Sequence, residues 1–428
     1  MRIVHVIENY FPDSLGGTET YVSNISKLMQ IAGEDVFVVS PRVESTERSD
    51  YIYDGIEVFR YPNSSNELKD VLTLDKEPSG LNYFVEIVNE LKPDIVHFHT
   101  FNRSVNVFHL KAVKKLGFKT VFTPHQAGIF CPKGSLLDYR GKRCRGIVNK
   151  SPCVKCYLSN QGLVGISSSF LSVVAGVLEE VPIINNILPA SLLVKRTRLR
   201  ELKSVAKEVD RVIAISPWVE KTFRVNEVNN VSLIRQGIDP EMISNIYHKG
   251  DDNVLRLTFV GRIYPIKSIE TLLDAIEKLE DSKRVLLTFA CVCGNDEYAL
   301  GIKKRAQNLA NIDWLENVCH EELKCVLAKS DFLVLPSISE MSPLVVLEAF
   351  AVGTPVIGSD IPPITDEVEN GENGIIFPTK NATELANIFS QLISKPEVKN
   401  KLRLGVPIPR TFKNVVTELL TVYHSLTR

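Results

Sequence analysis

The sequence has almost no net charge. Its 50 Lys and Arg residues nearly balance 51 Asp and Glu residues, which leaves a formal charge of −1 at pH 7. Without an excess of positive charge, there is no overall electrostatic reason to expect binding to nucleic acid. The remaining composition, 44% hydrophobic and 24% charged, is that of a globular protein, and the length of 428 residues favours two domains.

Long apolar runs are also missing. No run approaches the ~18 residues of a membrane-spanning helix, and the least polar region, residues 162–178, is interrupted by serines. The first apolar run, Ile3–Ile7, contains His5 and is too short for a signal peptide, so it predicts a strand. We therefore expect a cytoplasmic protein, whose eight cysteines stay reduced unless they bind a metal.

What the sequence does contain is a repeated alternation of short apolar runs and amphipathic segments. This alternation is typical of doubly wound α/β domains with parallel sheets. We predict domains at 1–240 and 251–405, a cysteine-rich loop at 126–159 that fits neither pattern, and a final segment at 406–428. The predicted strands are residues 2–7, 35–39, 94–98, 119–123, 211–215, 231–234, 256–260, 285–290, 332–335 and 355–357, and the predicted helices are 18–31, 269–279, 296–310 and 321–328.

The most informative stretch follows one of these predicted strands. The four apolar residues Phe332–Leu335 predict a parallel strand buried on both faces. Pro343 suits the first turn of a helix, and Gly353 stands where that helix would end. The segment also carries two carboxylates, Glu340 in the loop and Glu348 among apolar helix residues. A helix that starts at the carboxyl end of a strand is a natural anion site, so the segment predicts a phosphate-bearing ligand with hydroxyl groups.

This segment resembles the donor-site signature of family 4 glycosyltransferases, which are retaining enzymes of the two-domain GT-B fold. The matching pattern is E-x7-E-A followed by x3-G-x-P-V, formed by Glu340, Glu348, Ala349, Gly353, Pro355 and Val356. The resemblance implies two Rossmann-like doubly wound domains that face a central cleft, with the last helix, near residues 415–426, crossing back to the first domain. It also implies transfer of a sugar from a nucleoside diphosphate sugar to a saccharide or lipid-linked hydroxyl acceptor, in cell-surface polysaccharide or glycolipid synthesis, without a catalytic metal.

Two cations follow the predicted strand at 256–260. Arg262 and Lys267 suit a diphosphate, Arg through its planar fork and Lys as a point charge. Members of the resembled family carry an arginine and a lysine here for the donor diphosphate, and usually a glycine after the lysine, where this chain has Ser268. The alternative is a pair of solvated loop charges.

The resemblance also assigns roles to the two carboxylates of the segment after Phe332–Leu335. Glu348 matches the glutamate that holds the donor ribose, and Glu340 matches the one near the transferred sugar, where it would bind the sugar or stabilise an oxocarbenium-like state. Ser342 and Leu344, at the start of the helix, join the expected donor-binding set. The alternative for Glu340 is an exposed loop acid, and the alternative for Glu348 is a residue on the helix surface.

In the first half, the candidates are glycines and histidines. Gly16 and Gly17 follow the first predicted strand and would let the backbone approach the donor or acceptor, but they do not form a G-x-G-x-x-G dinucleotide motif. His125, at the end of the strand at 119–123, matches a family histidine near the transferred sugar and is a candidate catalytic residue. His97 and His99 alternate along one strand and should share a face. A structural role remains the alternative for all of these histidines.

The cysteines fall into two groups. Cys131, Cys144, Cys153 and Cys156 follow the spacing C-x12-C-x8-C-x2-C in a segment with few apolar residues, which predicts a structural zinc site. An iron–sulfur cluster and unligated thiols remain alternatives. The second group should consist of small buried apolar residues; it contains Cys291, Cys293, Cys319 and Cys325.

One further segment bears on the partners of the chain. The segment Lys195–Arg211 has seven basic and three acidic residues, and with the apolar Phe170–Leu178 it would suit peripheral docking on the inner face of the cytoplasmic membrane or on a lipid-linked acceptor. A solvated helix face would explain the same charges.

The function as a whole also has alternatives. The same fold would suit a nucleotide-sugar epimerase or phosphorylase, or a non-catalytic partner subunit.

Overall fold

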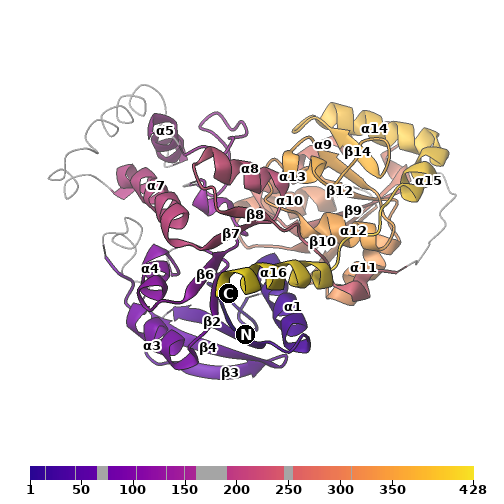
Figure 1. The fold of residues 1–428 in the computed structure, drawn as a ribbon. Helices are drawn as coiled ribbons and strands as arrows, with labels where there is room; N and C mark the ends of the chain where they lie inside the picture. The colour runs from indigo at the N-terminus through magenta and orange to yellow at the C-terminus, as the bar shows by residue number, and fades with distance from the viewer. Residues whose placement is uncertain are drawn as a thin grey trace. The chain divides into compact units, whose positions relative to one another are not determined.

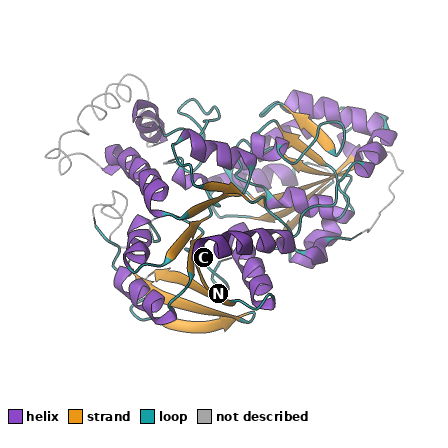
Figure 2. Cartoon of the chain, viewed as in Figure 1, coloured by secondary structure: helices purple, strands orange, loops and turns teal. Residues whose placement is uncertain are grey.

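The computed structural model describes residues 1–14, 16–43, 45–64, 76–102, 104–131, 133–148, 150–160, 190–244, 254–309 and 311–428. The chain forms two compact units (Figure 1). Unit 1 contains Met1–Arg235 and Lys413–Arg428, and unit 2 contains Gln236–Phe412. Strands and helices alternate in both units (Figure 2), and the α/β class predicted from the sequence is confirmed. Within the described parts of the chain, no helix is both long enough and apolar enough to span a membrane.

The sheet of unit 1 has the strand order β3-β4-β2-β1-β5-β6-β7-β8. Its pairs are parallel except at the edge, where β3 pairs with β4 in antiparallel orientation. This edge hairpin was not predicted, because β3 is short and none of its side chains is fully buried. The unit consists of β1 (Arg2–Val6), α1 (Gly17–Ile31), β2 (Asp35–Val43), β3 (Ser49–Tyr53), β4 (Ile56–Asn63), α3 (Leu81–Leu91), β5 (Ile95–Phe98), α4 (Val107–Lys115), β6 (Lys119–Phe122), a 3-10 turn (Ala127–Ile129), α5 (Lys150–Asn160), α7 (Ala190–Glu208), β7 (Arg211–Ala214), α8 (Pro217–Val225) and β8 (Val231–Leu233).

The last helix, α16 (Phe412–Thr427), belongs to unit 1 apart from its first residue. Tyr423 on this helix is fully buried, and its hydroxyl lies 2.5 Å from Nδ1 of His97 on β5. Thr427, near the helix end, contacts Met1. In Figure 1 the yellow final helix lies beside the indigo helix α1 near the start of the chain. The final helix therefore packs within the same unit as the start of the chain.

The described strands of unit 2 form a fully parallel sheet, with the order β11-β10-β9-β12-β13-β14. Residues 237–244 belong to this unit, and residues 245–253 lie outside the described residues. The elements are β9 (Leu255–Arg262), η4 (Pro265–Lys267), α9 (Ile269–Glu277), β10 (Val285–Val292), α10 (Glu297–Gln307), β11 (Ile312–Glu316), α11 (His320–Ala328), β12 (Phe332–Leu335), α12 (Leu344–Ala351), β13 (Val356–Ser359), α13 (Pro362–Thr365), β14 (Gly374–Phe377), α14 (Ala382–Ser394) and α15 (Pro396–Leu404), with 3-10 turns at Pro240–Met242 and Ser282–Arg284.

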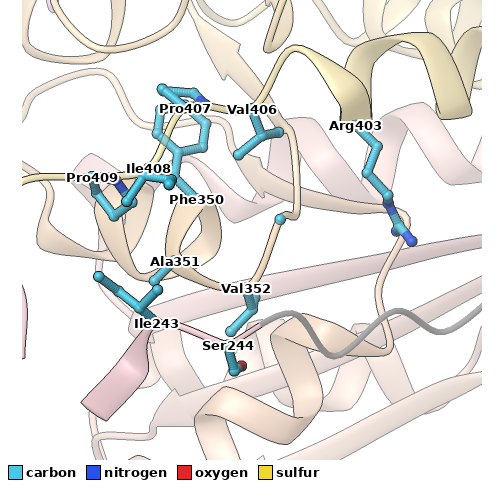
Figure 3. A pocket seen from close by; sticks show the side chains of 11 residues that line it. Ile243, Ser244, Phe350, Ala351, Val352, Arg403, Val406, Pro407, Ile408 and Pro409 are labelled. Atoms are coloured by element: carbon cyan, nitrogen blue, oxygen red, sulfur yellow. The ribbon is translucent and has the colours of Figure 1, made fainter. Parts of the chain in front are cut away.

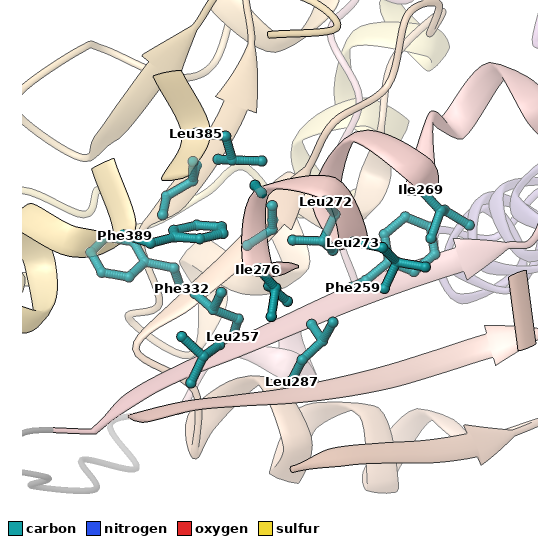
Figure 4. Close-up of a cluster of buried hydrophobic side chains, with 14 of the residues drawn as sticks. Leu257, Phe259, Ile269, Leu272, Leu273, Ile276, Leu287, Phe332, Leu385 and Phe389 are labelled. Carbon is teal, nitrogen blue, oxygen red and sulfur yellow. The ribbon is translucent and has the colours of Figure 1, made fainter. Parts of the chain in front are cut away.

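Both faces of this sheet are buried. On one face, the apolar side of α9 packs on β9 and β10 together with α14 (Figure 4). On the other face lie α11, α12 and α13. Strand β12 contributes Phe332 and Val334 to the first layer and Leu333 and Leu335 to the second. The prediction of a strand buried on both faces is therefore confirmed, and α12 is fixed on the sheet by Val346, Ala349 and Phe350.

One expectation about local structure is wrong. The segment 126–159 was expected to contain neither helix nor strand, but Lys150–Asn160 forms helix α5, which carries Cys153 and Cys156. The pattern is hard to see in the sequence, because this helix has almost no amphipathic character and starts with polar residues. The two cysteines are three residues apart and therefore lie on one side of the helix.

Candidate functional site

In unit 2, the candidate site begins where β9 and β12 end. These strands are neighbours and run parallel, so both carboxyl ends lie at the same edge of the sheet. Arg262 is the last residue of β9, and Lys267 ends the following turn η4. The loop after β12 is joined to this turn, because the Ile338 amide donates to the Ile266 carbonyl at 2.8 Å. Ser359 at the end of β13 donates to the Ser337 carbonyl and fixes the same loop.

Two of the predicted site residues contact each other directly. The Lys267 ammonium donates to Oε1 of Glu340 at 2.5 Å, and the Ser337 hydroxyl donates to the same oxygen at 2.8 Å. Both charged side chains are largely shielded from solvent, at 18% and 12% exposure. Since the dielectric is lower there than in bulk water, this ion pair interacts more strongly than a pair on the surface. Ser337 was not predicted, because a serine in a polar loop carries no specific signal.

Arg262 and Glu348 differ from this pair, because neither has a partner among the described residues. The Arg262 side chain is exposed at the strand end, where it can meet an anion from solvent. Glu348 lies on α12 with little access to solvent, and burial raises the pKa of its carboxyl from 4.5 to about 7. A carboxylate held in this environment without a donor is costly to the fold, which is typical of a residue that binds a ligand.

The start of α12 and the start of α9 complete the site in unit 2. Pro343 stands immediately before α12 rather than in its first turn, and Leu344 is its first residue, with Ser342 in the preceding loop; both Ser342 and Leu344 are partly exposed. Gly353 ends the helix region with a left-handed φ of 74°, as predicted. Ser268 also has a left-handed backbone, with φ 50° and ψ 45°. This conformation explains why glycine suits the position in the resembled family.

In unit 1, Gly16 and Gly17 are placed at the start of α1. Gly17 is the first helical residue, and Gly16 precedes it in extended conformation. A Cβ at Gly16 would lie 2.6 Å from Oε2 of Glu19, a buried residue whose Oε1 accepts a hydrogen bond of 2.6 Å from Ser14. A side chain at position 16 would therefore require the Glu19 carboxylate to move. Glu19 was not predicted, although its position two residues after the glycine pair is a usable signal.

The histidines form one cluster in the core of unit 1. His97 and His99 do share a face, with ring centroids 4.1 Å apart. The ring nitrogens of His5, His97 and His99 include donor atoms within 4.8 Å of one another, a separation that a metal ion could bridge. However, both nitrogens of His97 and of His99 make hydrogen bonds inside the protein. The cluster is therefore described better as a hydrogen-bonded network, which reaches His125 through His99.

A cavity of about 440 Å³ in unit 2 lies away from these residues. It is bordered by the C-terminal end of α12 and by the chain after α15 (Figure 3). Its walls are more apolar than polar, and Arg403 is the charged residue in its lining. Glu340 precedes the first residue of α12, at the end of the helix opposite to this cavity. Lys267 is hydrogen-bonded to Glu340 there. Because it lacks convergent polar groups, this cavity does not suit a nucleotide sugar.

The cysteine cluster is only partly assembled. Burial raises the pKa of Cys156 to about 11, and the nearby thiols of Cys153 and Cys144 act in the same direction. These three residues are therefore neighbours, whereas Cys131 lies in the turn after β6. Among the described residues, no three of these sulfurs lie within 4.8 Å of one another. A zinc ion with bonds of ~2.3 Å would draw them closer.

The second cysteine group was predicted only partly correctly. Cys291 is buried on β10 and Cys293 is half-buried, but Cys319 and Cys325 are exposed at either end of the first two turns of α11. The error arises because cysteine is apolar by type, while its position on a helix decides its exposure. The apolar stretch Phe170–Leu178 lies outside the described residues, as do the side chains of 195–198 in the basic segment.

Comparison with known families tests the resemblance to family 4 glycosyltransferases. Residues 15–159 match the family described as Glycosyltransferase Family 4, and residues 245–404 match Glycosyl transferases group 1. The chain belongs to glycosyltransferase family 4. The match to group 1 includes Arg262, Lys267, Glu340 and Glu348, and the match to family 4 includes Gly16, Gly17 and His125.

Individual relatives of this family 4 chain agree with the assignment. A D-inositol 3-phosphate glycosyltransferase of Rhodococcus erythropolis is 32% identical over 165 residues, which are 37% of each protein. The chain spans about half or less of the length of the curated relatives that it matches. A sucrose-phosphate synthase of Thermosynechococcus elongatus has a similar structure, with TM-score 0.70, 18% identity and coverage of 99% and 98% of the two chains. The structure of Anabaena HepE in complex with UDP is also similar, with a TM-score of 0.66, 15% identity, and coverage of 99% of this chain and 100% of the HepE chain. These likenesses establish the GT-B fold.

Proposed function

We propose that this family 4 chain transfers a sugar from a nucleoside diphosphate sugar to a hydroxyl acceptor, with retention of configuration at the anomeric carbon. The observation that carries the proposal is the contact of Lys267 with Glu340 at the ends of β9 and β12, beside the unpaired Arg262. A diphosphate needs two cations, and a sugar next to it needs a carboxylate. The arrangement supplies these groups at one edge of a parallel sheet, where α/β proteins bind their ligands.

Each residue then has a distinct role. Arg262 and Lys267 neutralise the diphosphate, which carries growing negative charge as the bond to the sugar breaks. Glu348 accepts hydrogen bonds from the ribose hydroxyls, which would provide the partners that it lacks in the unliganded protein. Glu340 is held by Lys267 and Ser337, so its carboxylate remains beside the cation that meets the leaving group. There it would stabilise positive charge on the transferred sugar.

The choice of donor and acceptor follows from the relatives. HepE is a structural neighbour in complex with UDP, so UDP-sugars are the first donors to test. The Rhodococcus relative is named for D-inositol 3-phosphate, which makes polyol phosphates suitable first acceptors besides saccharides and lipid-linked saccharides. A role in cell-surface polysaccharide or glycolipid synthesis would be consistent with such acceptors. Neither the chain's own sugar nor its acceptor is assigned by these names.

The test is a product assay with and without acceptor. A transferase forms a glycosylated product only when an acceptor is present, and NMR of the product should show the same anomeric configuration as the donor. An epimerase would change the sugar without an acceptor, and a phosphorylase would require phosphate. A non-catalytic subunit would bind the nucleotide without forming product. Inverted configuration, or product formed without acceptor, would contradict the proposal.

We also propose that Cys131, Cys144, Cys153 and Cys156 hold one structural zinc ion. The support is chemical: three of the thiols are neighbours, and the segment 131–160 contains few apolar residues that could stabilise it otherwise. Four protein ligands leave no open position for catalysis, so zinc would only stabilise the fold. Because the pKa of Cys156 is raised, binding of zinc must release protons and should weaken at low pH.

The zinc proposal is tested by elemental analysis of protein purified without a metal-affinity tag. We expect about one zinc per chain, and Cys144→Ser together with Cys156→Ser should reduce it to background. Exposed cysteines supply the control, since Cys319→Ser and Cys325→Ser should leave the metal content unchanged. Less than about 0.2 zinc per chain, without iron, would contradict a metal site. Iron with acid-labile sulfide would replace zinc by a cluster on the same ligands.

A further inference from the structure

Three histidine rings in unit 1 form a continuous chain of hydrogen bonds. Nδ1 of His5 lies 2.9 Å from Nε2 of His99, and Nδ1 of His99 lies 3.2 Å from Nε2 of His125. The rings come from the adjacent parallel strands β1, β5 and β6, or from the residues just after them, so the sheet itself sets their spacing. His5 and His99 are fully buried, whereas the His125 side chain is partly exposed.

All three rings are neutral near pH 7. Burial lowers the pKa of His5 to about 3, and it lowers the pKa of His125 in the same direction. The pKa of His99 falls well below its usual value, because it is buried and also surrounded by other imidazoles. A neutral imidazole has one N–H donor and one acceptor nitrogen. The direction of one hydrogen bond in the chain therefore determines the direction of the next.

Only two arrangements of protons satisfy both hydrogen bonds. In the first, His5 donates to His99 and His99 donates to His125, so His125 keeps its proton on Nδ1. In the second, His125 donates from Nε2, and the chain ends with a proton on Nε2 of His5. That nitrogen is buried and has no hydrogen-bond partner among the described residues. Since a buried N–H without an acceptor is rarely found in proteins, the first arrangement is preferred.

We propose that His99, supported by His5, is a positioning residue that fixes His125 as its Nδ1–H tautomer. The free face of His125 then presents a hydrogen-bond donor, because Nδ1 has no partner among the described residues. Such a donor suits a hydroxyl group of the bound sugar. This role rests on the proposed function, but the tautomer itself is a property of the unliganded protein. Tyr21, whose ring centroid lies 4.7 Å from that of His125, packs against the ring and limits its rotation.

The tautomer can be measured directly. In full-length protein with ¹⁵N-labelled histidine, long-range ¹H–¹⁵N correlation spectra distinguish a protonated ring nitrogen from an unprotonated one. We expect His125 to carry its proton on Nδ1 between pH 6.5 and 8, with the signal assigned from the spectrum of His125→Gln. A proton on Nε2, or a rapidly exchanging mixture, would overturn the proposal. Because this measurement needs no substrate, it separates the proposal from any failure of the proposed transferase activity.

Substitution of His99 separates positioning from packing. Asn can place an amide N–H near the position of Nδ1, whereas Leu fills the space but has no donor. If His99 positions His125, the His99→Asn variant should keep the Nδ1–H tautomer and a kcat within about threefold of wild type, and His99→Leu should lose the tautomer and at least tenfold in kcat. KM for the donor should stay unchanged in both. A pure packing role would reverse the order, because Leu preserves volume better.

The neighbouring His97 provides a matched control. Its Nδ1 bonds the Tyr423 hydroxyl and its Nε2 lies 2.7 Å from Oγ1 of Thr123, so it belongs to the same buried cluster but not to the chain. Tyr423→Phe removes one of these bonds with little change of volume. We expect this variant to keep the His125 tautomer and kcat. A change of tautomer in Tyr423→Phe equal to that in His99→Leu would show a general loosening of the core and would contradict a specific role of His99.

Discussion

The candidate sites of the two units differ in the charge of their side chains. In unit 2, charged groups gather at the ends of β9 and β12: the Lys267–Glu340 pair and the exposed Arg262. In unit 1, the candidate groups are neutral imidazoles, held by one another inside the core, and the glycines at the start of α1. Charge would bind a diphosphate, while a fixed neutral donor would orient a sugar. The contrast suggests a division between holding the leaving group and arranging the reacting group.

The two units also differ in the free-energy cost of holding these groups without a ligand. The unit 2 residues retain access to solvent or an ion partner, so their charges survive without a ligand. The exception is Glu348, whose carboxylate has no partner among the described residues and whose pKa is raised to about 7. The unit 1 histidines avoid this cost by being neutral and hydrogen-bonded. The following substitutions test whether the charges of unit 2 are used for the donor.

Removal of the diphosphate cations should have the largest effect. Lys267→Ala and Arg262→Ala should each lower kcat by ~10²-fold or more, the usual cost of losing one stabilising donor in a transition state. The control is Lys303→Ala, which breaks the Lys303–Glu316 pair of 2.6 Å on the surface of the same unit. We expect that variant to keep wild-type kcat. The measurement is steady-state turnover at saturating donor.

Two outcomes would contradict this role. Wild-type turnover in both site variants would place the diphosphate elsewhere. A fall in turnover accompanied by a loss of cooperative unfolding would instead indicate a structural role, so thermal unfolding is measured in parallel. Lys267→Ala leaves Ser337 as a donor to Glu340, which should limit the loss of stability.

Glu348→Gln should have the next largest effect. The amide keeps the size of the side chain but loses the ionised acceptor, so the affinity for the nucleotide should fall by ~1.5–3 kcal/mol. Isothermal titration calorimetry measures this affinity. Because wild type must ionise Glu348 to bind, its affinity should rise as pH increases from 6 to 8, and the affinity of the variant should not. An equal pH dependence in both proteins would show that another group titrates.

The same substitution has a consequence for stability. The pKa of Glu348 in the folded protein, about 7, exceeds the ordinary value of 4.5, so the folded state binds its proton more tightly than the unfolded state. This group therefore reduces stability progressively as pH rises from about 4.5 to 7. Glu348→Gln should be at least as stable as wild type at pH 8, and its advantage should shrink at pH 5. A lower Tm than wild type at pH 8 would mean that the carboxylate has a stabilising partner.

The smallest expected effect is at Ser268. Its left-handed backbone favours glycine, but glycine also increases the entropy of the unfolded chain and removes the 2.9 Å bond between the Ser268 and Thr271 hydroxyls. These contributions oppose each other, so Ser268→Gly should change stability by less than ~1 kcal/mol. Ser268→Val should be clearly worse, since β-branched residues rarely adopt this conformation. Equal unfolding free energies for the two variants in urea would contradict the assignment of strain.

The sequence predicted the local structure around the candidate residues better in unit 2 than in unit 1. The predicted strand, loop and helix around Glu340 and Glu348 follow one another without insertion. The contact between Lys267 and Glu340 joins residues 73 positions apart, and only the pairing of β9 with β12 brings them together. The fold class was predictable from the repeated apolar runs, but the edge strand β3 was not, because its alternation is weak.

The histidine chain shows a different limit. Alternation placed His97 and His99 on one face, but His5 stands 94 positions before His99, and a single histidine in an apolar run has no evident role. Its importance depends on the order of β1 and β5 in the sheet, which the sequence alone does not give. The zinc ligands remain a prediction from the spacing of the cysteines.

The central claim is that the ends of β9 and β12 bind a nucleoside diphosphate. The most direct test is calorimetric titration of the wild-type protein with UDP, GDP and ADP, followed by the best of these with Arg262→Ala and Lys303→Ala. We predict that one nucleotide binds with a Kd below ~1 mM, the usual upper range for substrates, that Arg262→Ala weakens it at least tenfold, and that Lys303→Ala leaves it unchanged. No binding of any of the three nucleotides, or binding that Arg262→Ala leaves unaffected, would contradict the claim.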